Sequence, residues 1–170
     1  MTGAMIAEAL DNLGKVLAAN PDKARARYQP ATATVIDGLK CRVIGPNGEQ
    51  IETDMPPAMG GSGSCPNPGW FFRASMAACC ATVIAQQAAQ RGITLTRLEV
   101  TVEGDGDNRG LLGLDEKVSA GHSALRTNVV IAAQSATPEQ LQALVQWANE
   151  HSPVGCTVRD APANTLHVIT

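Results

Sequence analysis

The spacing of apolar residues changes character along the chain. Near the N-terminus apolar residues recur every three or four positions from Ile6 to Leu17, which is typical of an amphipathic helix, and Pro21 closes this segment. From Ala31 onward apolar and polar residues alternate instead, as they do in half-exposed strands, and residues 46–48 (Pro-Asn-Gly) indicate the turn of a hairpin. We therefore predict a helix followed by a small antiparallel meander of three strands.

The most apolar part of the chain comes next. Residues 55–69 are mostly Gly, Pro and Ser, so we expect them to form a loop. Residues 70–91 predict a long helix that Gly92 ends. The middle of this helix, residues 74–85, is apolar almost all round and must be covered on every side. A short chain with small sheets has too little surface for that task, so we predict a homodimer.

Two further strands, a helix and a last strand are expected after the long helix. Alternation predicts strands over residues 94–103 and 125–133. Thr137, followed by proline and then by glutamine three positions on, has the form of a capping box at a helix start. A short turn or helix begins at Ser152, and residues 165–169 alternate as a final strand. This order indicates an α+β fold with antiparallel sheets around a long, central, buried helix.

Composition and charge restrict the class of protein. The 170 residues are 44% hydrophobic but only 3% aromatic, so the core must consist of aliphatic side chains. The net charge is −3 and basic residues do not cluster with aromatic ones, so we expect no nucleic-acid partner. No apolar run reaches the length of a membrane span, and residues 1–11 lack the features of a secretory signal. Five cysteines without the spacing of a disulfide framework fit a reducing compartment, so we expect a cytoplasmic protein without a membrane partner.

Metal and cofactor motifs are absent or incomplete in the sequence. Residues 105–116 match most of a calcium-loop pattern, but Arg109 occupies a ligand position and a strand precedes the loop, so an acidic surface loop is the better interpretation. The histidines and cysteines lack the spacing of a zinc site, and no phosphate- or dinucleotide-binding motif occurs. We therefore expect no metal and no cofactor.

The cysteines of the long helix are the remaining candidates for chemistry. Cys79 and Cys80 are neighbours, and neighbouring side chains on a helix point about 100° apart, so one pocket can use only one of them. A buried helical cysteine is more often a small hydrophobic residue than a nucleophile. Taken alone, these residues leave packing and thiol chemistry both open.

Short motifs around the long helix resemble those of a known family. The segments Gly60-Gly61, Asn67-Pro68, Phe71-Phe72 and Ala77-Ala78-Cys79 resemble the GG…NP…LF…AAC signature of the OsmC/Ohr family, the osmotically induced and organic hydroperoxide resistance proteins. Residues 152–158 resemble a later segment of that family. The resemblance implies an intertwined dimer with two long central helices flanked by sheets. Residues 1–27 are then expected to be a helical extension, and residues 28–170 the OsmC-like domain.

The resemblance also implies a chemistry and the groups that perform it. In the peroxidases of the family a helical cysteine attacks the hydroperoxide, an arginine and a glutamate activate it, and a second cysteine resolves the sulfenate into a disulfide. Cys79 matches the attacking position and Ser152 the resolving position. The glutamate position falls on Gly69, and the arginine is expected near residues 35–37, where none occurs.

Other residues of the chain are candidates to replace the missing groups. Cys156 lies one helical turn beyond Ser152 and is a candidate second thiol. Arg73 lies seven residues before Cys80 on the same helix face. There it would lower the pKa of that thiol, or it would be solvated or bridge the two chains of a dimer. Cys65 lies in the Gly- and Ser-rich loop and is expected to be an exposed thiol.

Two functions from different classes follow. The first is an OsmC-like stress protein that reduces organic hydroperoxides through Cys79, with Cys156 as a second thiol and an external thiol as reductant. The second is a non-catalytic OsmC-fold dimer that binds a small apolar ligand at its interface. A redox sensor in which Cys79 and Cys156 become oxidised is a third alternative.

Overall fold

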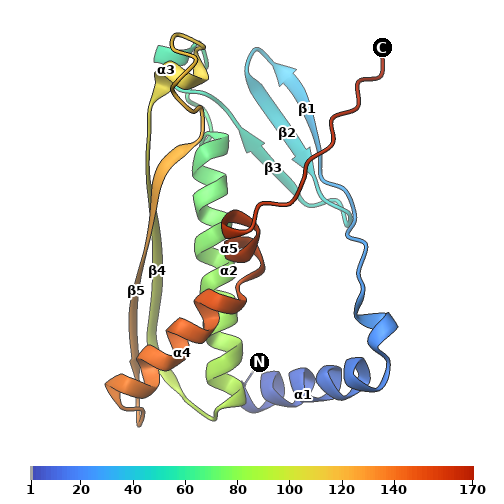
Figure 1. Cartoon of the computed structure of the whole chain (residues 1–170), viewed down its shortest axis with the longest axis vertical. Coiled ribbons are helices and arrows are strands. Elements are labelled where there is room, and N and C mark those ends of the chain that lie inside the picture. The colour runs from blue at the N-terminus through green and yellow to red at the C-terminus, as the bar shows by residue number, and fades with distance from the viewer. Residues whose placement is uncertain (1) are drawn as a thin grey trace. The chain divides into compact units, whose positions relative to one another are not determined.

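The computed structural model describes residues 2–170, which form two compact units (Figure 1). One unit combines the chain up to Asn12 with residues 75–170, and the other is residues 13–74. Helices α1 (Gly3–Ala19) and α2 (Pro68–Gln90) each begin in one unit and end in the other. No helix within residues 2–170 is long and apolar enough to cross a membrane. The division at residue 27 between an extension and an OsmC-like domain stays a prediction.

The unit of residues 13–74 contains the predicted meander. Its three strands pair antiparallel in the order β1-β2-β3, and two short 3-10 helices flank them: the bounds are η1 Pro21–Ala24, β1 Thr32–Asp37, β2 Lys40–Ile44, β3 Gln50–Thr53 and η2 Pro57–Met59. Gly48 closes the β2–β3 turn with a φ of 85°, a left-handed conformation that favours glycine. The hairpin predicted at residues 46–48 is therefore confirmed.

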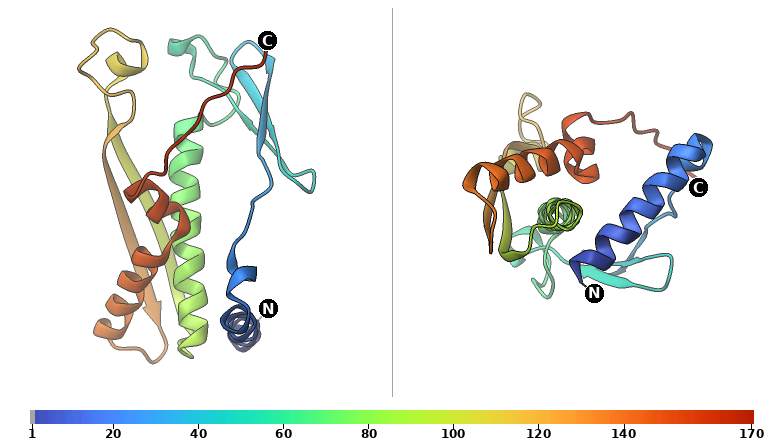
Figure 2. Two further views of the ribbon diagram at one scale, coloured as in Figure 1. Left: turned by 45° about the vertical axis from the view of Figure 1, so that its right-hand side comes forward. Right: turned by 90° about the horizontal axis from the view of Figure 1, so that it is seen from below.

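The larger unit is built on a long two-stranded ribbon. Its other elements are β4 Leu95–Gly106, α3 Asn108–Leu111, β5 His122–Ala133, α4 Pro138–His151 and α5 Pro153–Arg159. The strands β4 and β5 pair antiparallel, with Val100 opposite Val129. Helix α2 runs alongside this ribbon, and α4 packs beside α2 (Figures 1 and 2). Both strands extend further than predicted, β4 as far as Gly106 and β5 from His122 onward, and the connection between them contains the short helix α3.

The core of this unit lies where α2, α4 and the ribbon meet. Its buried residues are Cys80, Val83, Ile84 and Ala88 of α2 and Leu144 and Ala148 of α4. Apolar strand residues such as Leu98 and Ile131 pack against them. The buried residues of α2 form one stripe, because their spacing of three and four keeps them on one side of the helix. The homodimer expected to cover its other sides stays a prediction.

The ends of the helices follow the expected local rules. Thr137 accepts a hydrogen bond from the backbone N–H of Gln140, and the Gln140 side chain accepts one from the backbone N–H of Thr137. This reciprocal pair is the predicted capping box. Helix α2 ends where Gly92 adopts a φ of 66° and Ile93 bonds back to Ala88.

The final strand predicted over residues 165–169 is wrong. These residues lie in a C-terminal segment without helix or strand, and Leu166, Val168 and Ile169 are exposed. Their alternation satisfies the local pattern of a strand, but a strand exists only when a neighbouring strand takes its hydrogen bonds. Both described sheets pair without this segment.

The packing predicts which leucine holds this unit together. Leu144 is fully buried against α2, whereas Leu111 is 54% exposed in α3. We expect Leu144→Ala to lower the free energy of unfolding by about 2–5 kcal/mol, because it leaves a cavity. Leu111→Ala is the matched control and should change it by less than about 0.5 kcal/mol. Urea denaturation followed by circular dichroism measures both, and equal effects would contradict the described core.

Candidate functional site

The clearest polar contact in the core joins α2 to the start of α5. The hydroxyl of Ser152 donates a hydrogen bond to the sulfur of Cys79 over 3.2 Å. Ser152 is only 3% exposed, while Cys79 is half-buried. The backbone N–H of Gly155 donates to the same hydroxyl oxygen at 3.4 Å, so this hydroxyl accepts one hydrogen bond and donates another. The two residues at the positions of the attacking and resolving cysteines therefore meet in this chain.

The sequence of α4 explains why Ser152 reaches α2. Leu144, Ala148 and Ser152 are all buried and lie four residues apart, so they share one face of the helix and its end. Leu144 and Ala148 pack into the core with α2, and Ser152 continues this line. Ser152 ends α4 and caps α5, because Pro153 follows it at the first helical position and its side chain accepts from Gly155.

Cys80 occupies a different environment from its neighbour Cys79. Its side chain is buried in the core, and this burial, with a smaller contribution from Cys79, raises its pKa above the ordinary value of a thiol. The uncharged thiol therefore behaves as a small core residue that also borders a groove beside α4. Of the two adjacent cysteines, Cys79 is the one with a hydrogen-bond donor at its sulfur.

Cys156 lies on α5, but its hydrogen bonds lead elsewhere. Its sulfur accepts a bond from the Arg159 side chain at 3.1 Å and donates to the carbonyl of Glu150, also at 3.1 Å. Both Cys79 and Cys156 are free thiols. The structure thus brings Ser152 to Cys79, and it places Cys156 at the corner between α4 and α5.

The position expected for the activating glutamate is occupied by Gly69, in the first turn of α2. At Gly69 the nearest groups to an added Cβ would be the side chains of Asn67, at 3.3 Å, and Arg73, at 3.8 Å. Asn67 caps the start of α2, because its side-chain oxygen accepts from the backbone of Trp70. The guanidinium of Arg73 therefore lies beside the place where the family glutamate is expected.

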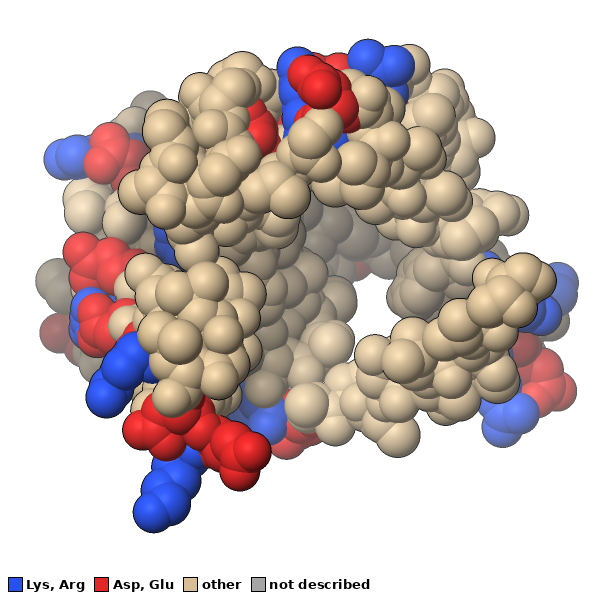
Figure 3. All heavy atoms as spheres, turned by 90° about the horizontal axis from the view of Figure 1, so that it is seen from above, with Lys and Arg blue, Asp and Glu red and all other residues tan. Residues whose placement is uncertain are grey.

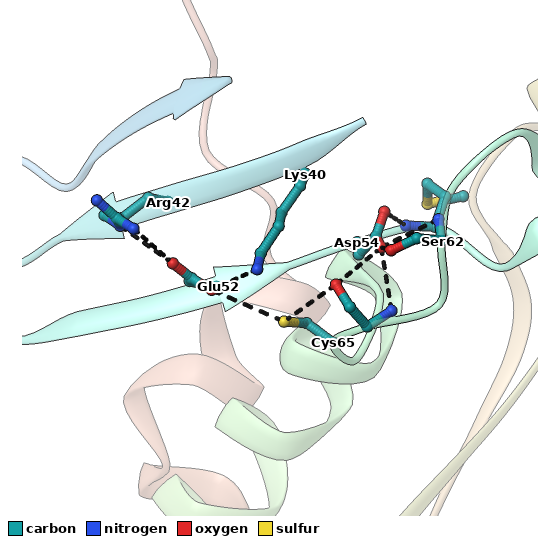
Figure 4. Close-up of polar contacts among 8 residues, drawn as sticks. Lys40, Arg42, Glu52, Asp54, Ser62 and Cys65 are labelled. Carbon is teal, nitrogen blue, oxygen red and sulfur yellow. Dashed lines mark hydrogen bonds and ion pairs between the residues drawn. The ribbon is translucent and has the colours of Figure 1, made fainter. Parts of the chain in front are cut away.

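A second polar cluster, not foreseen from the sequence, surrounds Asp54 (Figure 4). One carboxylate oxygen accepts four hydrogen bonds, from the backbone and hydroxyl groups of Ser62 and Ser64, and the other accepts from Met55. Asp54 is 2% exposed, and these bonds, foremost the Ser62 hydroxyl and then the Ser64 backbone, hold its pKa well below the usual range. The loop therefore closes around a buried negative charge. Gly61 passes so close to Met55 and Asp54 that a side chain there would collide with them.

Beside this loop a carboxylate links two cations and a thiol (Figure 4). Glu52 pairs with Lys40 and Arg42, both at 2.8 Å, and Cys65 points its sulfur at the same carboxylate at 4.0 Å. The hydrogen bond from Lys40 is the main reason why the pKa of Glu52 is lowered. Cys65 is half-buried here, so the prediction of an exposed thiol is wrong.

Two carboxylates of the calcium-like pattern are engaged by arginines. Asp105 pairs with Arg126 across the ribbon, and Asp107 pairs with Arg109 while capping α3. Acidic and basic side chains accordingly stand next to each other on the face shown in Figure 3. From Thr2 to the C-terminus, no group of three or more His, Cys, Asp or Glu residues is placed to hold a metal ion.

Comparison with known proteins identifies the family of this chain. The family described as OsmC-like protein matches residues 61–167, and the chain belongs to this family. An OsmC-like protein from Mycoplasma pneumoniae superimposes with a TM-score of 0.67 at 16% identity, covering 80% of this chain and 89% of that one. This likeness confirms the α+β fold. A comparison with curated proteins finds no match.

Two organic hydroperoxide resistance proteins are also similar in structure. The protein from Legionella pneumophila has a TM-score of 0.56 at 25% identity, covering 79% of this chain and 92% of its own. OhrB of Bacillus subtilis has a TM-score of 0.51 at 22% identity, covering 78% and 93%. The resemblance to the OsmC/Ohr family is therefore confirmed.

The buried charge of Asp54 generates a prediction about pH. A carboxylate whose pKa is lowered by folding contributes stability above about pH 4, and this contribution is lost as the pH falls toward its folded value. Asp54→Asn should therefore lower the urea midpoint at pH 7, and its difference from the wild type should shrink below about pH 4. Hydrogen exchange of the Ser62 and Ser64 amides should accelerate roughly tenfold.

The exposed carboxylate of Asp22 provides a matched control within the same unit. Asp22→Asn should leave both the midpoint and the exchange of the loop amides unchanged. Unaltered exchange in Asp54→Asn would show that the loop is not organised by this charge.

Proposed function

We propose that this chain is a thiol-dependent hydroperoxide reductase with Cys79 as its nucleophile. The observation that carries the proposal is the hydrogen bond from Ser152 to the Cys79 sulfur, since it places a buried donor where negative charge is needed. Family membership and the likeness to organic hydroperoxide resistance proteins support an organic hydroperoxide as substrate.

The proposed reaction is balanced by an external thiol. The Cys79 thiolate attacks the terminal oxygen of the hydroperoxide, the O–O bond breaks, and the alkoxide takes a proton and leaves as an alcohol. Cys79 is thereby oxidised to a sulfenic acid. One external thiol then forms a mixed disulfide with Cys79 and releases water. A second external thiol attacks that disulfide, which restores Cys79 and yields a disulfide between the two external thiols.

Ser152 determines how the sulfenic acid is resolved in this proposed cycle. Its hydroxyl donates to the sulfur before the reaction and remains a donor beside the sulfenate, but an alcohol cannot form a disulfide. Resolution therefore falls to the external thiol, and Cys156 stays a proposed second thiol. We also propose that the chain acts as a homodimer, because only one stripe of α2 is buried by its own chain.

A second candidate function is a non-catalytic dimer of the same fold that binds a small apolar ligand. The observation that favours it is Gly69, which leaves Arg73 and Asn67 beside a position without a carboxylate. Under this alternative Cys79 would not react with a hydroperoxide.

Intact-mass spectrometry of the reduced protein tests the mechanism. After one equivalent of cumene hydroperoxide we expect the wild type to gain one oxygen and Cys79→Ser to remain unchanged. Cys80→Ala is the adjacent control and should still gain the oxygen. A wild-type mass that stays constant would exclude the peroxidase mechanism, and a loss of two protons that disappears in Cys156→Ser would assign Cys156 as the second thiol.

Two substitutions at Ser152 separate its role from simple packing. Ser152→Ala removes the hydrogen bond to the sulfur and should slow oxidation of Cys79 roughly tenfold. Ser152→Cys places a second thiol beside Cys79, so the product should lose two protons instead of gaining oxygen. Stopped-flow kinetics and peptide mapping measure these effects, and unchanged kinetics in Ser152→Ala would contradict the proposed role.

A further inference from the structure

A groove of about 840 Å³ lies between β5 and α4, with Cys80 of α2 among its lining residues. This volume falls within the range of about 300–1,000 Å³ that is typical of small-molecule sites. Cys79 and Ser152 are not among its lining residues, so the groove is a separate feature from the thiol site. The chemistry of its lining residues indicates which kind of molecule it can bind.

One wall is the apolar face of β5. Leu125, Thr127, Val129 and Ile131 line the groove at alternate positions, as side chains on one face of a strand do. Asn128 lies between them and points to the opposite face of the ribbon. This wall therefore offers mainly hydrocarbon, with the single hydroxyl of Thr127.

The other wall is α4, which adds hydrogen-bonding groups. Leu141 and Val145 continue the apolar surface, while Gln142, Gln146 and Asn149 recur at intervals of four and three along one side of the helix. Side-chain amides both donate and accept hydrogen bonds without carrying charge. The lining contains no Asp, Glu, Lys or Arg.

We propose that this groove binds an uncharged amphipathic small molecule, with its hydrocarbon part against β5 and a polar head toward the amides of α4. A charged ligand would lose water without gaining a counter-ion from the lining, which costs free energy. Cys80 adds no charge to the groove, because burial raises the pKa of its thiol and keeps the thiol uncharged. The inference does not depend on the proposed chemistry of Cys79.

A pair of fluorescent probes that differ in one charged group tests the ligand class. N-phenyl-1-naphthylamine is neutral, and 1-anilinonaphthalene-8-sulfonate has the same ring system with a sulfonate added. We expect fluorescence titration of the full chain to show that the neutral probe binds at least roughly tenfold more tightly. Equal affinities, or no binding of the neutral probe, would overturn the proposal.

A pair of neighbouring substitutions tests the location. Thr127→Glu places a charge in the groove, whereas Asn128→Glu places the same charge on the other face of the strand. Both side chains are exposed, so both variants are expected to fold. Thr127→Glu should weaken the neutral probe roughly tenfold, and Asn128→Glu should leave its affinity unchanged. Equal losses in the two variants would overturn the location.

A thiol introduced into the groove supplies a third measurement. Thr127→Cys places an exposed thiol among the lining residues, and saturating neutral probe should slow its labelling by N-ethylmaleimide at least roughly threefold, because the probe occupies the space beside it. Labelling of Cys41, which lies in the other unit, should not change. A thiol at position 127 that the probe does not protect would overturn the proposal. Oxidation of Cys79 by hydroperoxide reports independently on the proposed function, so the two failures are distinguishable.

Discussion

The contact between α2 and α4 is the constraint on which the functional features of this chain depend. Ile84 and Leu144 are completely buried where the two helices and the β4–β5 ribbon meet. Because α4 is held by this face, its end brings Ser152 to Cys79, and its flank forms one wall of the groove. The same packing desolvates Cys80. Two adjacent cysteines thus acquire different environments from their position relative to one aliphatic contact.

Features set by neighbouring residues could be predicted from the sequence. The turn at Gly48 and the capping box at Thr137 depend on a few consecutive positions, and both formed as expected. Residues 165–169 failed for the complementary reason, because alternation describes only the strand itself and carries no information about a partner. The extent of the β4–β5 ribbon was also underestimated, since its paired ends contain the glycines and aspartates that usually indicate loops.

The candidate site was likewise predicted only in part from the sequence. Cys79 and Ser152 were identified by their resemblance to family positions, but only the shared face of Leu144, Ala148 and Ser152 explains why they touch. The charge of Asp54 and its partners were missed, because its hydroxyl donors lie eight and ten residues further along the chain. A serine-rich loop after an aspartate is the signal that could have indicated hydrogen bonds to the Asp54 carboxylate. The same residues also occur in loops that are exposed to water, so the sequence alone does not distinguish the two cases.

The oxygen atom at position 152 has a consequence for the mechanics of the molecule. A pair of thiols there would be able to staple α2 to α5, and the chain would then contain a closed covalent ring whenever it was oxidised. A serine excludes such a ring between positions 79 and 152 in every oxidation state of Cys79. At this contact the freedom of α5 to move relative to α2 is therefore set by noncovalent packing, and oxidation of Cys79 changes the chemical group beside Ser152 without linking the two residues.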